Sequence, residues 1–148
     1  MKHLRIAAAA ALTFGFAALP AMAEDLPVEP GDYVEISSIT VDDGHTLDYI
    51  NHLAGQWRKG QDYAKAQGWI SSYEILSNEY PRAGEPDFYL VTRFPRFADP
   101  AEGKKRDDMY NAYMQSTMAQ AQAASADRAK YRHLSGMMLL RSWNWAKK

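Results

Sequence analysis

The chain has 148 residues, no cysteine, and 17 Lys and Arg residues against 18 Asp and Glu residues. The lack of cysteine excludes disulfides, thiolate metal sites and a cysteine nucleophile. A slightly acidic, well-mixed charge argues against nucleic acid or an anionic membrane as a partner.

The first 23 residues follow the three-part pattern of a secretory signal peptide. Lys2 and Arg5 give a basic start, residues 6 to about 19 form an apolar run, and Ala21-Met22-Ala23 has the small-x-small cleavage pattern. The run is shorter than the ~20 residues that span a bilayer. We therefore predict cleavage after Ala23 and a periplasmic or secreted protein that has no membrane contact once the signal peptide is removed.

The mature sequence has the length of one domain, with residues 24–30 as an extended lead-in and residues 31–148 as the domain itself. Alternating apolar residues predict a first strand over 33–41. Asp43 is the candidate N-cap of a long helix over 45–67. The apolar stripe of this helix consists of Leu47, Ile50, Leu53, Ala54, Trp57 and Ala64.

Two strands follow the first helix. Gly68 suits the left-handed position after the helix end, and a strand is predicted over 70–76. Residues 77–86 are rich in turn-forming residues and are predicted to be a loop. The aromatic and β-branched segment over 88–94 predicts the third strand.

A second long helix and a last strand complete the chain. Asp99-Pro100-Ala101-Glu102 has the pattern of a capped helix start. The helix is expected to reach about His133, with a bend near 123–125. Gly136 ends the helix, and residues 137–143 are predicted to form the last strand.

The order strand, helix, strand, strand, helix, strand predicts an α+β fold with two long helices on one face of a sheet. The last strand is apolar at every position from Met137 to Leu140, so neither of its faces is suited to water. Helices within one chain cover a single sheet face, and we therefore expect a homodimer that covers the other. The alternative is an ordinary alternating strand that exposes one Met and one Leu.

This order and size resemble the ferredoxin-like dimeric α/β-barrel superfamily, which includes antibiotic-biosynthesis monooxygenases, heme-degrading monooxygenases, and EthD-like and NIPSNAP-like proteins. The resemblance covers residues 31–145 and implies a βαββαβ fold, a four-stranded antiparallel sheet, paired sheets in a dimer, and a ligand held between sheet and helices. The heme-degrading members use an Asn, a Trp and a His from separate elements, whereas Asn51, His52 and Trp57 fall on one predicted helix. This difference argues against heme, and no cofactor is expected.

The inner faces of the helices and the sheet contain aromatic and polar residues that could line a ligand pocket. A polar side chain within an apolar stripe needs a hydrogen-bonding partner, and a ligand can supply one. The ligand-binding candidates are Trp57, Gln61, Arg93, Tyr110, Tyr113 and Thr117. The alternative is that the rings fill the core with their polar ends in water, while Arg93 and Arg141 pair across strands or at the dimer seam.

The sequence identifies no catalytic residue and no metal site. His45 and His52 are seven residues apart on one helix face opposite the apolar stripe, which at ~1.5 Å of rise per residue is too far for one metal ion. Both are interpreted as residues of a solvated face. Adjacent acidic pairs such as Asp42-Asp43 diverge from each other and are interpreted as helix-end charges.

Two hypotheses follow from these observations. The first is an exported small-molecule-binding protein, with a cofactor-independent monooxygenase-like enzyme acting on an aromatic or polar-apolar substrate as one form of it. The alternative is a non-catalytic structural or stress-related homodimer. A cavity of about 300 Å³ or more surrounded by Trp57, Gln61 and Tyr113 would favour the first hypothesis, and a filled core there would favour the second.

Overall fold

The computed structural model describes residues 26–147. The predicted signal peptide and cleavage point lie outside this range. The predicted α+β class is confirmed: the described residues form a mixed structure with a four-stranded antiparallel sheet. The elements in chain order are β1 (Val28–Val41), α1 (Thr46–His52), η1 (Leu53–Trp57), α2 (Arg58–Ala66), β2 (Ser72–Ser77), β3 (Phe88–Phe94), α3 (Pro100–Met114), α4 (Met118–Arg128) and β4 (Arg132–Trp145).

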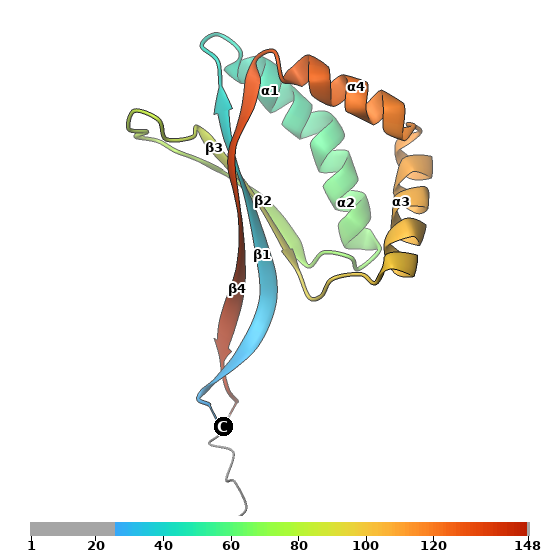
Figure 1. The fold of residues 1–148 in the computed structure, drawn as a ribbon. Helices are drawn as coiled ribbons and strands as arrows, with labels where there is room; N and C mark the ends of the chain where they lie inside the picture. Colours follow the sequence, from blue (N-terminus) through green and yellow to red (C-terminus); the bar gives the residue numbers. More distant parts are fainter. Residues whose placement is uncertain (1–25, 148) are drawn as a thin grey trace, which may run out of the picture.

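The sheet has the strand order β2-β3-β1-β4, and the helices lie on one side of it (Figure 1). Residues directly opposite each other on neighbouring strands point to the same face. Ile39 of β1 and Phe88 of β3 are such a pair, and both belong to the core under the helices. The buried members of that core are Ile39, Val41, Tyr49 and Leu53.

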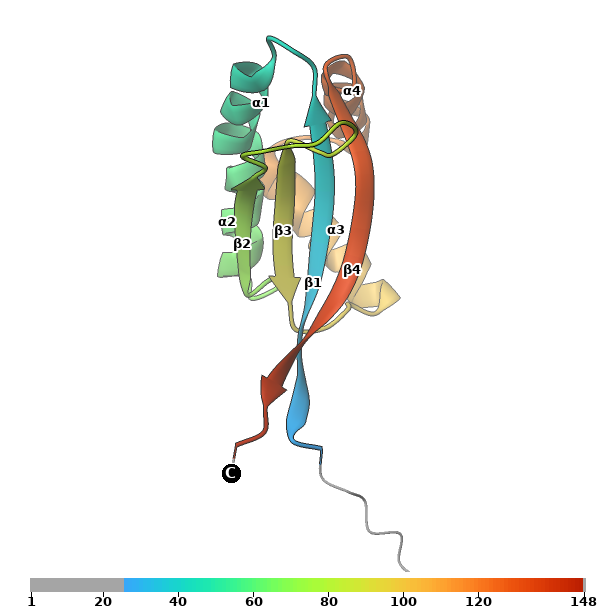
Figure 2. The ribbon, with the colours of Figure 1, turned by 90° about the vertical axis from the view of Figure 1, so that its left-hand side faces the viewer.

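The opposite sheet face, here called the open face, has no helix over it in Figure 2, which looks onto this face with the helices behind. Ile36 at its centre pairs with Val91 on one side and Met138 on the other. Val91 is 2% exposed, whereas Met138 is 46% exposed. The centre of the open face is therefore shielded from solvent by neighbouring side chains of the same face. At the β4 edge of this face, apolar side chains remain exposed to solvent.

The two longest strands, β1 and β4, continue past the end of β3 as a two-stranded ribbon. Val28 to Pro30 pair with Trp143 to Trp145, and Figure 1 shows this ribbon extending away from the rest of the sheet. Residues 28–30 thus belong to β1 and not to a lead-in, and β4 is longer at both ends than predicted. The ribbon exposes 57% of Trp143 and 83% of Trp145.

The first long helix is confirmed as a continuous helical segment, but its details differ from the prediction. Its N-cap is His45, which makes no side-chain cap, so the expected role of Asp43 is wrong. Tyr49 is 1% exposed, whereas Leu47 of the predicted stripe is 68% exposed. The helix contacts the sheet through Tyr49 and Leu53, which are one turn apart. The π-helical turn η1 then rotates the residues after it relative to the positions that a regular α-helix would give them.

The second long helix is two helices. Asp99 caps α3 as predicted, since its side chain accepts a hydrogen bond from the Glu102 backbone N–H at 2.9 Å. The helix ends at Met114 because Gln115 adopts a left-handed conformation with φ of 53°. Thr117 then starts α4 through a reciprocal capping box with Gln120. The expected bend near 123–125 is therefore wrong, and Figure 1 shows α3 and α4 meeting at a corner.

Candidate functional site

Trp57 separates two hollows of the molecule. It is the last residue of η1, is partly buried, and its ring meets that of Tyr73 edge to face at 5.3 Å. One hollow, here called the sheet groove, lies between the first helical segment and strands β2 and β3 and has a volume of about 700 Å³. The other, here called the helix hollow, lies between that segment and the corner of α3 and α4 and has a volume of about 500 Å³. Both volumes fall within the range of about 300–1,000 Å³ that is usual for ligand pockets.

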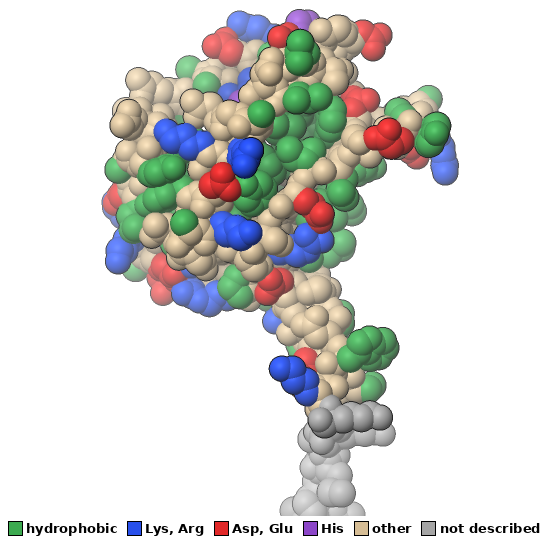
Figure 3. Space-filling view, turned by 180° about the vertical axis from the view of Figure 1, so that it is seen from behind, with side chains coloured by type: hydrophobic (Ala, Val, Ile, Leu, Met, Phe, Trp, Pro, Cys, Tyr) green, Lys and Arg blue, Asp and Glu red, His purple; other side chains and the backbone are tan. Residues whose placement is uncertain are grey.

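The sheet groove has an apolar floor. Leu53 and Trp57 line it from the helix, and Ile75 and Phe88 line it from the sheet. Figure 3 shows hydrophobic side chains gathered in a hollow on the side of the molecule that carries α1, α2 and the free edge of β2. Such a floor suits the aromatic or aliphatic body of a ligand.

Charged and polar side chains form one rim of the sheet groove. Arg58, Asp62 and Lys65 lie there on α2. The Tyr73 hydroxyl donates a hydrogen bond to Asp62, and this bond, followed by burial, raises the pKa of Tyr73 above its usual value. Arg58 Nε lies 3.6 Å from an Asp62 oxygen. The Asp62 carboxylate thus already interacts with Tyr73 and Arg58. The charged side chains of this rim can orient the polar end of a ligand.

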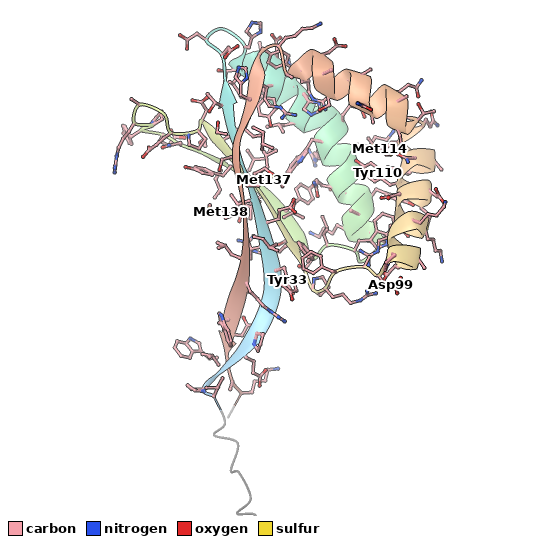
Figure 4. The ribbon with its side chains drawn as sticks, viewed as in Figure 1. Tyr33, Asp99, Tyr110, Met114, Met137 and Met138 are labelled. Atoms are coloured by element: carbon pink, nitrogen blue, oxygen red, sulfur yellow. The ribbon has the colours of Figure 1, made fainter. Side chains whose placement is uncertain are left out.

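The helix hollow is built by the π turn and by the break between α3 and α4. His52, Gln56 and Trp57 line it from the first helical segment. Tyr110 and Met114 line it from α3, and Figure 4 places both on the side of α3 that faces α2. Burial raises the pKa of Tyr110, so its hydroxyl stays protonated.

His52 is partly buried in this hollow, so its interpretation as a solvated residue is wrong. Burial lowers its pKa to about 4, and the positive charges of Arg128 and Arg132 lower it further in the same direction. The imidazole is therefore uncharged near neutral pH and offers one donor and one acceptor. The reason is that the first helix buries the face of Tyr49 and Leu53 and not that of Leu47, and the His52 ring lies 6.1 Å from that of Tyr49 at the side of this buried face.

The structure brings two of the six predicted ligand-binding residues together: Trp57 and Tyr110 both line the helix hollow. Gln61 and Tyr113 line neither hollow. The Tyr113 ring instead stacks on that of Tyr63 at 4.1 Å. Thr117 is used as the cap of α4.

Arg93 lies on the opposite side of the sheet from both hollows. It pairs with Val34 and Ser72 in the sheet register, and its Nη1 donates to a Glu74 oxygen at 2.8 Å. This is the cross-strand ion pair that the sequence offered as the alternative. Alternation along β3 places Arg93 on the same sheet face as Val91, but alternation alone does not show which face meets the helices.

Most of the lining residues were not among the predicted ligand-binding residues, and His52, Gln56, Tyr73 and Arg128 are examples. Arg128 fell in a stretch expected to continue as helix, so nothing distinguished it from a surface charge. The one available signal was Thr117 followed three residues later by Gln120, a capping-box pattern that would have placed the break correctly.

Within residues 26–147, no group of three or more His, Asp or Glu side chains is arranged to hold a metal ion. In the same part of the chain, no helix is long and apolar enough to cross a membrane. The sequence matches no protein-family model, and a search of curated proteins found no match. The functional proposal therefore depends on the two hollows and the sheet.

Proposed function

We propose that the mature chain is an exported small-molecule-binding protein and that the sheet groove holds an aromatic or polar-apolar ligand. The observation that carries this proposal is an apolar groove of about 700 Å³ beside Trp57 with a charged rim on one side. The leader pattern that ends at Ala23 supports export. A cofactor-independent monooxygenase-like activity is one use of such a groove, because Trp57 and Tyr73 can orient an electron-rich substrate.

The strand order also supports a ferredoxin-like plan for the fold. In β2-β3-β1-β4 the first and third strands are central and antiparallel, and a helical segment follows each of them along the chain. That arrangement is the βαββαβ order expected from the sequence. Fold alone does not assign an activity, so the proposal depends on the groove.

Filling the sheet groove should abolish ligand binding while the fold is retained. Ala54 lines the groove and is exposed, so Ala54→Trp adds a ring to the groove without displacing a buried side chain. We expect at least a tenfold loss of affinity for the neutral fluorophore Nile red, together with loss of any ligand that native mass spectrometry finds in protein purified from its own host. The matched control is Ala112→Trp on an exposed position of α3, which should bind as the parent does. Unchanged binding by Ala54→Trp would contradict the proposal.

The second candidate, a structural homodimer, is favoured by the open face. Met138 and Leu140 of β4 expose 46% and 50% of their surface there, and Figure 4 shows Met138 on the opposite side of the strand from Met137. Exposed apolar sheet surface of this kind marks an association site.

A charge on the open face should separate such a dimer into folded monomers. We expect light scattering at micromolar concentration to show a dimer for the parent and a monomer for Leu140→Glu. Leu139 points to the other face and is 53% exposed, so Leu139→Glu is a matched control that should remain dimeric. A well-folded monomeric parent would count against the dimer.

A further inference from the structure

The helix hollow lies beside two arginines that have no acidic partner among residues 26–147. None of the ion pairs formed by these residues includes Arg128 or Arg132. The Nε atoms of both are buried and have no hydrogen-bond acceptor. A buried N–H without an acceptor is unfavourable, and native proteins rarely leave one so. Two neighbouring arginines of this kind indicate an acceptor that comes from outside the chain.

Arg128 is the arginine that lines the hollow. It is the last residue of α4, and the hollow opens between it and the first helical segment, where His52 ends α1 and Gln56 lies in the π turn η1. No Asp or Glu lines the hollow. Burial, followed by the nearby charge of Arg132, lowers the pKa of Arg128.

The other polar groups of the helix hollow add hydrogen-bond donors but no charge. His52 is uncharged near neutral pH for the reasons given above, and Gln56 and Gln120 supply side-chain amides. The apolar part of the lining consists of Trp57, Met114, Ala121 and Ala124. The hollow therefore combines one guanidinium, several neutral hydrogen-bonding groups and an apolar wall.

We propose that the helix hollow binds a small organic carboxylate, with the carboxylate on Arg128 and the apolar body against Trp57 and Met114. A guanidinium matches a carboxylate through two parallel N–H donors. The apolar wall of the hollow suits the hydrocarbon body of an organic carboxylate, which inorganic phosphate lacks. This site is separate from the sheet groove, on the other side of Trp57.

The test uses NMR titration of the mature protein with benzoate and octanoate, and with benzamide and inorganic phosphate as comparisons. We expect at least one carboxylate to shift the Nε–H resonance of Arg128 and the indole N–H of Trp57. Benzamide, which is close to benzoate in shape but uncharged, should bind at least tenfold more weakly than benzoate. Failure of both carboxylates, equal binding of benzamide and benzoate, or tighter binding of phosphate would overturn the proposal.

Arg128→Gln should weaken carboxylate binding at least tenfold and leave the melting temperature unchanged or higher, because it removes an uncompensated charge. The matched control is Arg82→Gln, which changes an exposed loop arginine. A lower melting temperature with unchanged carboxylate affinity would give Arg128 a structural role and overturn the proposal. The two proposals can fail separately, since Arg128→Gln should still bind Nile red and Ala54→Trp should still bind the carboxylate.

Discussion

Replacing Tyr49 with alanine is expected to lower the free energy of unfolding by about 3–5 kcal/mol, the range typical of removing a large buried aromatic side chain. Tyr49 is 1% exposed and forms the core with Ile39, Val41 and Leu53. Its ring lies 5.9 Å from that of Phe88, so truncation would leave a cavity between the first helix and the sheet. Small domains have only about 5–15 kcal/mol of stability, so this one change should remove a large part of it.

Urea unfolding followed by circular dichroism measures this loss, with Tyr80→Ala as the matched control. Tyr80 is 92% exposed in the loop between β2 and β3, and its removal should change the stability by less than about 0.5 kcal/mol. Leu47→Ala tests the helix face directly. If the stripe read from the sequence were the core, Leu47→Ala would cost as much as a buried leucine, and Tyr49→Ala would cost little.

The position of a strand was predictable from the sequence where turn-forming residues stand at both of its ends. β3 has the predicted bounds, because a loop rich in Pro and Gly precedes its aromatic and β-branched run and Pro95 follows it. Gly68 takes the left-handed conformation expected of it, with φ of 71°, and the Trp69 N–H bonds back to the Ala64 carbonyl at 3.0 Å. Local chemistry of this kind acts within a few residues and is visible in the sequence.

The candidate site was less predictable because it depends on departures from regular helices. A π turn at Leu53–Trp57 carries no reliable sequence signal, yet it sets the positions of His52 and Trp57 relative to each other. Gln115 adopts a left-handed conformation without being Gly or Asn, so the end of α3 had no marker of its own. The helix hollow exists only because both irregularities occur.

The open face illustrates a different limit. Alternation along β1 and β3 divides residues into two sets, but apolar side chains occur in both sets, such as Ile36 in one and Ile39 in the other. Periodicity then fixes which residues share a face without showing which face the helices cover. That choice is made by packing against Tyr49 and Leu53, and the predicted stripe included Leu53 but not Tyr49.

Introducing a valine at Gly60 is expected to cost about 2–3 kcal/mol, because it overpacks the contact between α2 and α3. Gly60 is buried, and a Cβ atom built on it would lie 3.0 Å from Cζ of Tyr110 and closer still to the hydroxyl oxygen. The phenol ring is rigid and partly buried, so the helices must move apart or Tyr110 must leave its place. Since Tyr110 also lines the helix hollow, Gly60→Val should weaken carboxylate binding as well.

The matched control is Gly103→Val in α3, where a Cβ atom meets nothing within 4 Å and the stability should change by less than about 0.5 kcal/mol. Adding Tyr110→Ala to Gly60→Val should recover about 1–2 kcal/mol relative to the sum of the single changes, because the clash is removed. Equal stabilities of the two glycine variants in thermal unfolding would contradict the close approach of α2 and α3. The absence of a side chain at Gly60 is thus what allows Tyr110 to reach the first helical segment, and with it the wall that the helix hollow needs.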